Sequence, residues 1–220
     1  MFSREEIEFI ADLCKKHNAL YISDEVYEWL VYDGSEHIRA ATLPDMWERT
    51  VTICSAGKTF NATGWKTGWA IGPERFITAC MKVHQGIVYT IPTPLQVALA
   101  SSLRHEKELL GTEASYWYWL VNTMKGKRDR IFKMLQHAGL NPIMPQGGYF
   151  MVADISSLRE KLDGDEVDIL DSAVSEWMVK EKVCVRNRNT ILNISKVVVF
   201  VRFLRFLRVF IHRIDPEFQT

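Results

Sequence analysis

The first clear hydrophobic pattern of the chain lies between residues 4 and 17. Ser3 and Glu6 stand at its start as an S-x-x-E capping box, which is a signal for the beginning of a helix. Apolar side chains then recur at helical spacing, at Ile7, Ile10, Leu13 and Cys14. This spacing predicts an amphipathic helix with one side packed against a core.

Three short segments farther along have the composition of strands. Residues 19–23 and 50–55 are almost continuously apolar or β-branched, as expected for parallel strands buried on both faces. Residues 64–72 contain several apolar side chains separated by glycines, and they predict a third strand. Helix and strand in alternation indicate an α/β fold, in which ligands bind beyond the carboxyl ends of the strands.

The remainder of the chain is predicted to be helical first and then mixed. We expect helices over about residues 74–85, 94–109 and 112–137, a strand over 147–154 and an amphipathic helix over 165–181. A domain boundary is placed within the long helix, near residue 115. The chain is therefore expected to form parts of two domains.

Residues 197–211 are densely apolar but carry Arg202, Arg205 and Arg208 at every third position, which is too many charges for a transmembrane span. Two interpretations remain open for this tail. It forms a core strand followed by an irregular or non-native end, which we favour, or a basic amphipathic helix that lies on a membrane surface.

Charge and cysteine content narrow the class of partner. The 220 residues include 27 Lys and Arg against 27 Asp and Glu, so the chain has no electrostatic footprint for nucleic acid. The expected partner is a small molecule or a second copy of the chain. The four cysteines are widely spaced and predict buried thiols of a reducing compartment rather than a metal site.

The polar, acidic N-terminus is unlike a secretory signal. It predicts a cytoplasmic location, or a mitochondrial one if a longer N-terminus exists.

Groups able to do chemistry lie at the ends of the first two predicted strands and at the start of the third, and would converge at one end of the sheet. Lys58 stands on a tight glycine turn, where a shielded amine beside a second cation is suited to Schiff-base formation. That cation, Lys66, and the hydroxyl of Ser55 are able to hold a phosphate. Asp24 is suited to a protonated pyridine nitrogen, and Tyr27 to an oxygen on the same ring.

Taken singly, these residues carry little information, since an aspartate at a strand end is usually a turn residue and a lysine is usually solvated. Their conjunction is what indicates a site. Gly57, Lys58 and Thr59 also imitate the end of a Walker A loop, but Thr52 stands where that motif needs a glycine. A nucleotide-phosphate site is therefore excluded.

Three ordered motifs make the sequence resemble a known family. Residues 22–34 (ISDEVYEWLVYDG), 55–60 (SAGKTF) and 63–69 (TGWKTGW) closely resemble the class I/II aminotransferases. Within that family they are similar to the kynurenine aminotransferase, or cysteine-conjugate β-lyase, group. The similarity extends from about Phe2 to Lys182, and beyond Lys182 the tail departs from the pattern.

The resemblance implies a fold-type-I enzyme that uses pyridoxal 5'-phosphate and is normally a homodimer. The fold would be α/β, with residues 1–115 as the C-terminal part of a large, cofactor-binding domain with a mixed sheet. Residues 116–220 would be a small α+β domain with an atypical tail from about 183. In the family an N-terminal half precedes these motifs, and this sequence contains none of it.

The resemblance also implies roles for individual residues. The lysine matching Lys58 carries the cofactor as a Schiff base and moves a proton, and the positions matching Asp24 and Tyr27 bind the ring nitrogen and ring oxygen. Those matching Ser55 and Lys66 hold the phosphate. The resemblance further suggests Tyr89 as part of a loop that reaches the partner subunit's pocket, and Arg202 as the arginine that binds the substrate carboxylate.

The implied reaction is transamination between kynurenine, or a similar aromatic or neutral amino acid, and a 2-oxo acid. Cysteine-conjugate β-elimination could accompany it. One alternative of a different class remains open, namely a catalytically inactive fragment. Such a fragment would act only by pairing with a full-length subunit or by membrane contact through residues 197–213.

Overall fold

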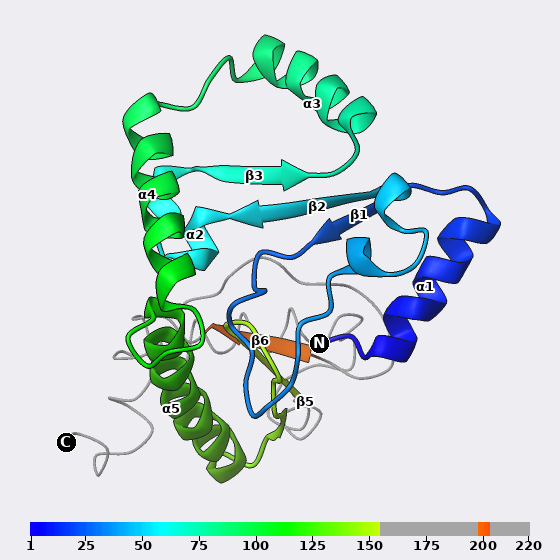
Figure 1. Cartoon of the computed structure of the whole chain (residues 1–220). Coiled ribbons are helices and arrows are strands. Elements are labelled where there is room, and N and C mark those ends of the chain that lie inside the picture. The colour runs from blue at the N-terminus through cyan, green and yellow to red at the C-terminus, as the bar shows by residue number, and fades with distance from the viewer. Residues whose placement is uncertain (155–197, 203–220) are drawn as a thin grey trace, which may run out of the picture. The chain divides into compact units, whose positions relative to one another are not determined.

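A computed structural model of the chain describes residues 1–154 and 198–202 (Figure 1). The chain divides into two compact units, Met1–Val121 and Asn122–Thr220, and each is described by itself. The first unit contains the three segments that carry the predicted chemistry. The predicted domain boundary near residue 115 stays a prediction.

Helix α1, Arg4–Lys16, confirms the first predicted element. The Ser3 hydroxyl accepts a hydrogen bond from the Glu6 amide, and the Glu6 carboxylate accepts one from the Ser3 amide, so the capping box is formed. The buried side of α1 packs against the 3-10 helix η1 (Ala40–Thr42) and the residues between η1 and a second 3-10 helix, η2 (Trp47–Arg49). The side chains of this core are Ile7, Ala11, Cys14, Ala40, Leu43 and Met46.

The first unit is built around a mixed three-stranded sheet in the order β1-β2-β3 (Figure 1). Strand β1 (Tyr21–Asp24) runs parallel to β2 (Thr50–Ser55), and β3 (Gly68–Ile71) runs antiparallel to β2. The prediction that the first two strands are buried on both faces is wrong. Ile22 is 61% and Ile53 is 39% exposed, although Val51 on the same face is only 6% exposed.

The third strand is shorter than predicted. It begins at Gly68, because the preceding residues form the 3-10 helix η3 (Thr63–Trp65) and Lys66 adopts a left-handed conformation with φ 54°. Glycine is required at position 68, since a Cβ there would lie 2.7 Å from the carbonyl oxygen of Cys54. The left-handed residue turns the chain back towards β2.

Helices α3 (Glu74–Ile87), α4 (Thr93–Leu109) and α5 (Tyr116–His137) confirm the three predicted helices. The last begins four residues later than expected, because residues 111–115 form a turn in which Gly111 has φ 82°. Helix α3 has no buried residue, whereas α5 buries a series of side chains along its length. These are Trp117, Leu120, Met124, Arg128, Ile131 and Leu135.

The second unit contains an antiparallel sheet in the order β4-β5-β6. Strand β5 (Phe150–Asp154) confirms the strand predicted over residues 147–154, while β4 (Asn141–Ile143) was not predicted. Strand β6, Val198–Arg202, bears out the strand interpretation of the tail over those residues. The predicted helix over 165–181 and the arginines at 205 and 208 lie outside the described residues.

The thiols only partly match the prediction. Cys14 and Cys54 are free and buried, but Cys80 is free and exposed on α3, a helix with no buried residue. Cys184 lies outside the described residues. The part of the chain that the structure describes contains no cluster of three or more His, Cys, Asp or Glu side chains that could bind a metal ion. Within the same residues, no helix is long and apolar enough to cross a membrane.

The capping box gives a first testable prediction. Ser3→Ala removes the acceptor for the Glu6 amide at 3.2 Å and is expected to lower the free energy of unfolding by about 1 kcal/mol. Urea unfolding measures the change. Ser101→Ala, on the exposed surface of α4, is the control and should be neutral. Equal destabilisation by the two substitutions would contradict a stabilising role for the cap.

Candidate active site

The carboxyl ends of β1 and β2 bring Asp24 and Ser55 to the same end of the sheet. Asp24 pairs in register with Ile53, and Ser55 lies two residues beyond Ile53. Because side chains alternate along a strand, all three point to the same face. The Asp24 side chain is exposed there, with its Oδ1 accepting a hydrogen bond from the Val26 amide at 3.4 Å.

Lys58 lies in the one-turn helix α2, Ala56–Thr59, which follows β2 directly. The Ser55 hydroxyl caps this helix by accepting a hydrogen bond from the Gly57 amide at 3.2 Å. A Cβ on residue 57 would lie 3.2 Å from both Ser55 Oγ and Thr63 Cα, so glycine permits the tight turn. Lys58 itself is half-buried.

Lys66 is held beside the start of α2 by the backbone. The Ala56 amide donates to the carbonyl oxygen of Thr67 at 3.0 Å, and Ser55 pairs with Gly68 across the β2–β3 ladder. Lys66, the residue before Thr67, is exposed. Ser55 and Lys66 therefore come from adjacent segments at one end of the sheet, as the sequence predicted.

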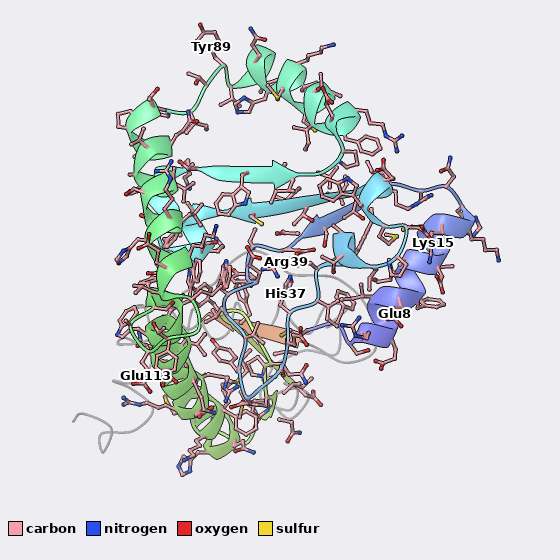
Figure 2. All side chains as sticks on the ribbon, in the orientation of Figure 1. Glu8, Lys15, His37, Arg39, Tyr89 and Glu113 are labelled. Atoms are coloured by element: carbon pink, nitrogen blue, oxygen red, sulfur yellow. The ribbon has the colours of Figure 1, made fainter. Side chains whose placement is uncertain are left out.

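The other three predicted site residues differ in their placement. Tyr27 is half-buried in the turn that follows β1. Tyr89 is 76% exposed, in the connection between α3 and α4, where Figure 2 shows it extending outward. Arg202 ends β6 opposite Phe150 in the second unit. The structure thus groups Asp24, Ser55, Lys58 and Lys66, and it does not bring Tyr89 to them; the roles predicted for all of these residues stay predictions.

A buried carboxylate next to Asp24 was missed by sequence reasoning. Glu25 is 3% exposed and accepts hydrogen bonds from the Ser23 hydroxyl at 2.9 Å and the Ala40 amide at 3.3 Å. Its Oε2 also lies 3.0 Å from Nε2 of His37, which is on the segment between β1 and β2 (Figure 2). Burial raises the pKa of Glu25, but these hydrogen bonds outweigh burial and hold it below the ordinary value of 4.5.

This network fixes the chain directly after Asp24. Asp24 and Glu25 are consecutive, so one carboxylate is exposed at the sheet end while the other anchors the loop that leaves β1. The sequence signal was the acidic pair at the end of an apolar run, of which only the first acid was interpreted. Two of the partners of Glu25, His37 and Ala40, lie 12 and 15 residues away and are not marked by any motif.

A second hydrogen-bonded group connects Glu28 with Arg39 and with Cys54 of β2. Glu28 accepts hydrogen bonds from Arg39 Nη2 at 2.6 Å and Nε at 3.1 Å, and Cys54 Sγ lies 3.7 Å from its Oε1. Burial, together with the nearby Glu28 carboxylate, raises the pKa of Cys54 to about 12. Cys54 is therefore a neutral thiol near neutral pH and not a nucleophile.

Comparison with known proteins identifies the family. Residues 1–206 match the family model described as aminotransferase class I and II. The chain belongs to this family. The match extends beyond Lys182, where the resemblance was expected to end, and it includes Arg202.

Curated relatives of this chain include two kynurenine–oxoglutarate transaminases. The human protein named transaminase 1 is 46% identical over 185 residues, which cover 83% of this chain and 44% of the relative. The mouse protein named transaminase 3 is 49% identical over 183 residues, covering 83% of this chain and 40% of the relative. The chain thus spans less than half the length of these relatives.

A solved structure supports the same assignment of fold. An aromatic aminotransferase from Pyrococcus horikoshii superposes with a TM-score of 0.79 at 25% identity, covering 96% of this chain and 53% of that one. The fold predicted from the sequence, a partial fold-type-I α/β transferase with a mixed sheet, is confirmed.

Class I and II aminotransferases depend on pyridoxal phosphate in general, and the grouped side chains fit this cofactor. Ser55 Oγ accepts a bond from Gly57 and so retains its own proton to donate to a phosphate oxygen. Lys66 adds a positive charge, Asp24 an exposed carboxylate and Lys58 a primary amine. These are the donor types that a phosphorylated, aldehyde-bearing pyridine requires.

Proposed function

We propose that this aminotransferase-family chain binds pyridoxal 5'-phosphate at the carboxyl ends of β1 and β2 and takes part in transamination. The observation that carries the proposal is the grouping of Asp24, Ser55, Lys58 and Lys66 at one end of a single sheet. These residues come from three sequence segments, and the β1–β2 and β2–β3 ladders bring those segments together.

Each residue has a distinct role in the proposed site. Ser55 donates a hydrogen bond to the phosphate, and the Lys66 ammonium balances its charge. The Asp24 carboxylate retains a proton on the pyridine nitrogen, and the Tyr27 phenol donates to the ring oxygen. When bound, the cofactor supplies an electron sink for carbanion chemistry.

Lys58 has two functions in this proposal. Its primary amine would hold the cofactor by condensing with the cofactor aldehyde, with loss of water, and when free it would accept the proton that leaves the substrate α-carbon. A position in a one-turn helix directly after β2 keeps the amine close to the strand ends. The half-buried side chain is partly shielded from water.

The substrates are proposed from the relatives. Two of them are named kynurenine–oxoglutarate transaminases, which supports an aromatic amino acid such as kynurenine as amino donor and a 2-oxo acid as acceptor. Arg202 is the proposed ligand of the substrate carboxylate, since a guanidinium binds a carboxylate through two parallel hydrogen bonds. Cysteine-conjugate β-elimination is a second proposed reaction of the same site.

A homodimer, typical of the family, is proposed as the assembly. Helix α3 supports it, because this helix has no buried residue and exposes apolar side chains. Met81 is 65%, Val83 60% and Ile87 78% exposed. Tyr89, in the adjoining connection, is proposed to reach the partner subunit. Light scattering of the purified chain measures the assembly, and a monomer at all concentrations would contradict this part of the proposal.

The proposed function is tested on the purified chain with added pyridoxal phosphate. Borohydride reduction would fix a bound cofactor to its lysine as a stable amine, and peptide mass mapping is expected to find the addition on Lys58. Incubation with kynurenine and 2-oxoglutarate should then yield glutamate. Labelling spread over exposed lysines, without product, would instead support the inactive-fragment alternative.

A further inference from the structure

Trp117, near the start of α5, contacts the backbone beside the cofactor lysine. Its indole Nε1 donates a hydrogen bond to the carbonyl oxygen of Thr59 at 3.1 Å, across 58 residues of sequence. Thr59 is the last residue of α2 and follows Lys58 directly. The Trp117 side chain is only 6% exposed, so water does not compete for this hydrogen bond.

The same indole also contacts the loop that follows β1. The rings of Trp29 and Trp117 stack with centroids 3.7 Å apart and planes inclined by 8°. Trp29 is two residues beyond Tyr27 and five beyond Asp24. One side chain is therefore attached to both segments of the proposed cofactor site, by a hydrogen bond on one side and by ring stacking on the other.

Trp117 is itself held by a buried polar group at the start of α5. Its amide donates to the Ser115 hydroxyl at 3.1 Å, and that hydroxyl donates to Glu106 Oε2 at 2.7 Å. Glu106 also accepts a bond from the Tyr116 amide at 3.0 Å. Glu106 is 5% and Ser115 3% exposed. The orientation of the Trp117 backbone is thus fixed by bonds that are shielded from solvent.

We propose that Trp117 is a positioning residue that sets the one-turn helix of Lys58 relative to the loop that follows Asp24 and carries Tyr27. This inference rests on the proposed function. A helix of four residues has almost no stability of its own, and its last carbonyl groups lack partners inside the helix. The direction of the Lys58 side chain therefore depends on contacts from outside α2, and Trp117 supplies one at the adjacent residue.

The conservative variant Trp117→Phe separates positioning from simple packing. Phenylalanine retains an aromatic ring against Trp29 but cannot donate to the Thr59 carbonyl. Loss of a hydrogen bond of this kind is expected to change the equilibrium for local opening of α2 by about 3- to 10-fold. Trp119→Phe is the matched control, because Trp119 lies on the same helix and is 55% exposed.

Two measurements on the full chain test the inference. The first is hydrogen exchange by mass spectrometry without cofactor, in which the peptide covering residues 56–62 should exchange about 5-fold faster in Trp117→Phe and not in Trp119→Phe. The second is the dissociation constant for pyridoxal phosphate. It should rise about 3- to 10-fold in Trp117→Phe alone.

The outcomes separate this inference from the proposed function. If the unsubstituted chain binds no cofactor at Lys58, the proposed function fails, and exchange of residues 56–62 still decides the role of Trp117. If Trp117→Phe matches the unsubstituted chain in exchange, the inference is overturned. Should Trp117→Phe not fold, Ser115→Ala removes the acceptor of the Trp117 amide and must reproduce the local increase in exchange; unchanged exchange there would equally overturn it.

Discussion

Replacing Lys58 with alanine is expected to abolish the visible absorption band of bound pyridoxal phosphate and to lower transamination about 10²- to 10⁴-fold or more. The substitution removes the amine that attaches the cofactor and the group that moves the α-proton, so both observables depend on one side chain. Because α2 retains its Ser55 cap and the Trp117 contact, the fold should persist. Circular dichroism checks this directly.

Lys82→Ala is the matched control for Lys58→Ala. Lys82 is an exposed lysine of α3, so its loss changes net charge equally without touching the proposed site. Lys58→Arg is a second comparison, since it retains the positive charge but cannot attach the cofactor. A full absorption band in Lys58→Ala, or its loss in Lys82→Ala, would show that another amine carries the cofactor.

The parts of the fold that the sequence predicted are those determined locally. Helix α1 carries its own start signal in Ser3 and Glu6, and the three long helices have strong periodicity. The predicted elements were wrong where the backbone conformation of a single residue, or pairing with a distant segment, determines the secondary structure. Lys66 in a left-handed conformation ends η3 and delays β3 to Gly68, and the short strand β4 exists through its pairing with β5.

In the candidate site, too, the residues that could be predicted are those that local sequence determines. Lys58, Ser55 and Lys66 lie within compact motifs, so resemblance to a family was enough to propose them. Glu25 and Trp117 act through partners that are far apart in sequence. Trp117 meets Thr59 and Trp29 only in the folded chain, across 58 and 88 residues of sequence respectively. Periodicity gives no information on such pairs, and coordinates are needed to find them.

Removing the buried carboxylate of Glu25 is expected to cause a large loss of stability. Glu25→Ala leaves the Ser23 hydroxyl, the Ala40 amide and His37 without their shared acceptor. Hydrogen bonds to a buried charged group are strong, so we expect the free energy of unfolding to fall by about 3 kcal/mol at neutral pH. Urea denaturation measures this loss, and Glu108→Ala, an exposed change on α4, should be nearly neutral.

The pH dependence of this effect has a definite sign. The pKa of Glu25 in the folded chain lies below its ordinary value of 4.5, so in the interval between these two values the unfolded chain binds more protons than the folded one. The contribution of Glu25 is therefore complete above the unfolded value and is lost as the pH falls through the folded one. The stability gap between the unsubstituted chain and Glu25→Ala should accordingly be larger at about pH 7 than at about pH 4.

Glu25→Gln completes the test, because glutamine retains the shape and one acceptor oxygen but does not titrate. Its stability should lie between those of the unsubstituted chain and Glu25→Ala at neutral pH. As the pH falls, the unsubstituted chain should approach Glu25→Gln, since a protonated Glu25 is also neutral. A gap to Glu25→Gln that stays constant or widens on acidification would mean that the carboxylate is not held in its charged form by Ser23, His37 and Ala40.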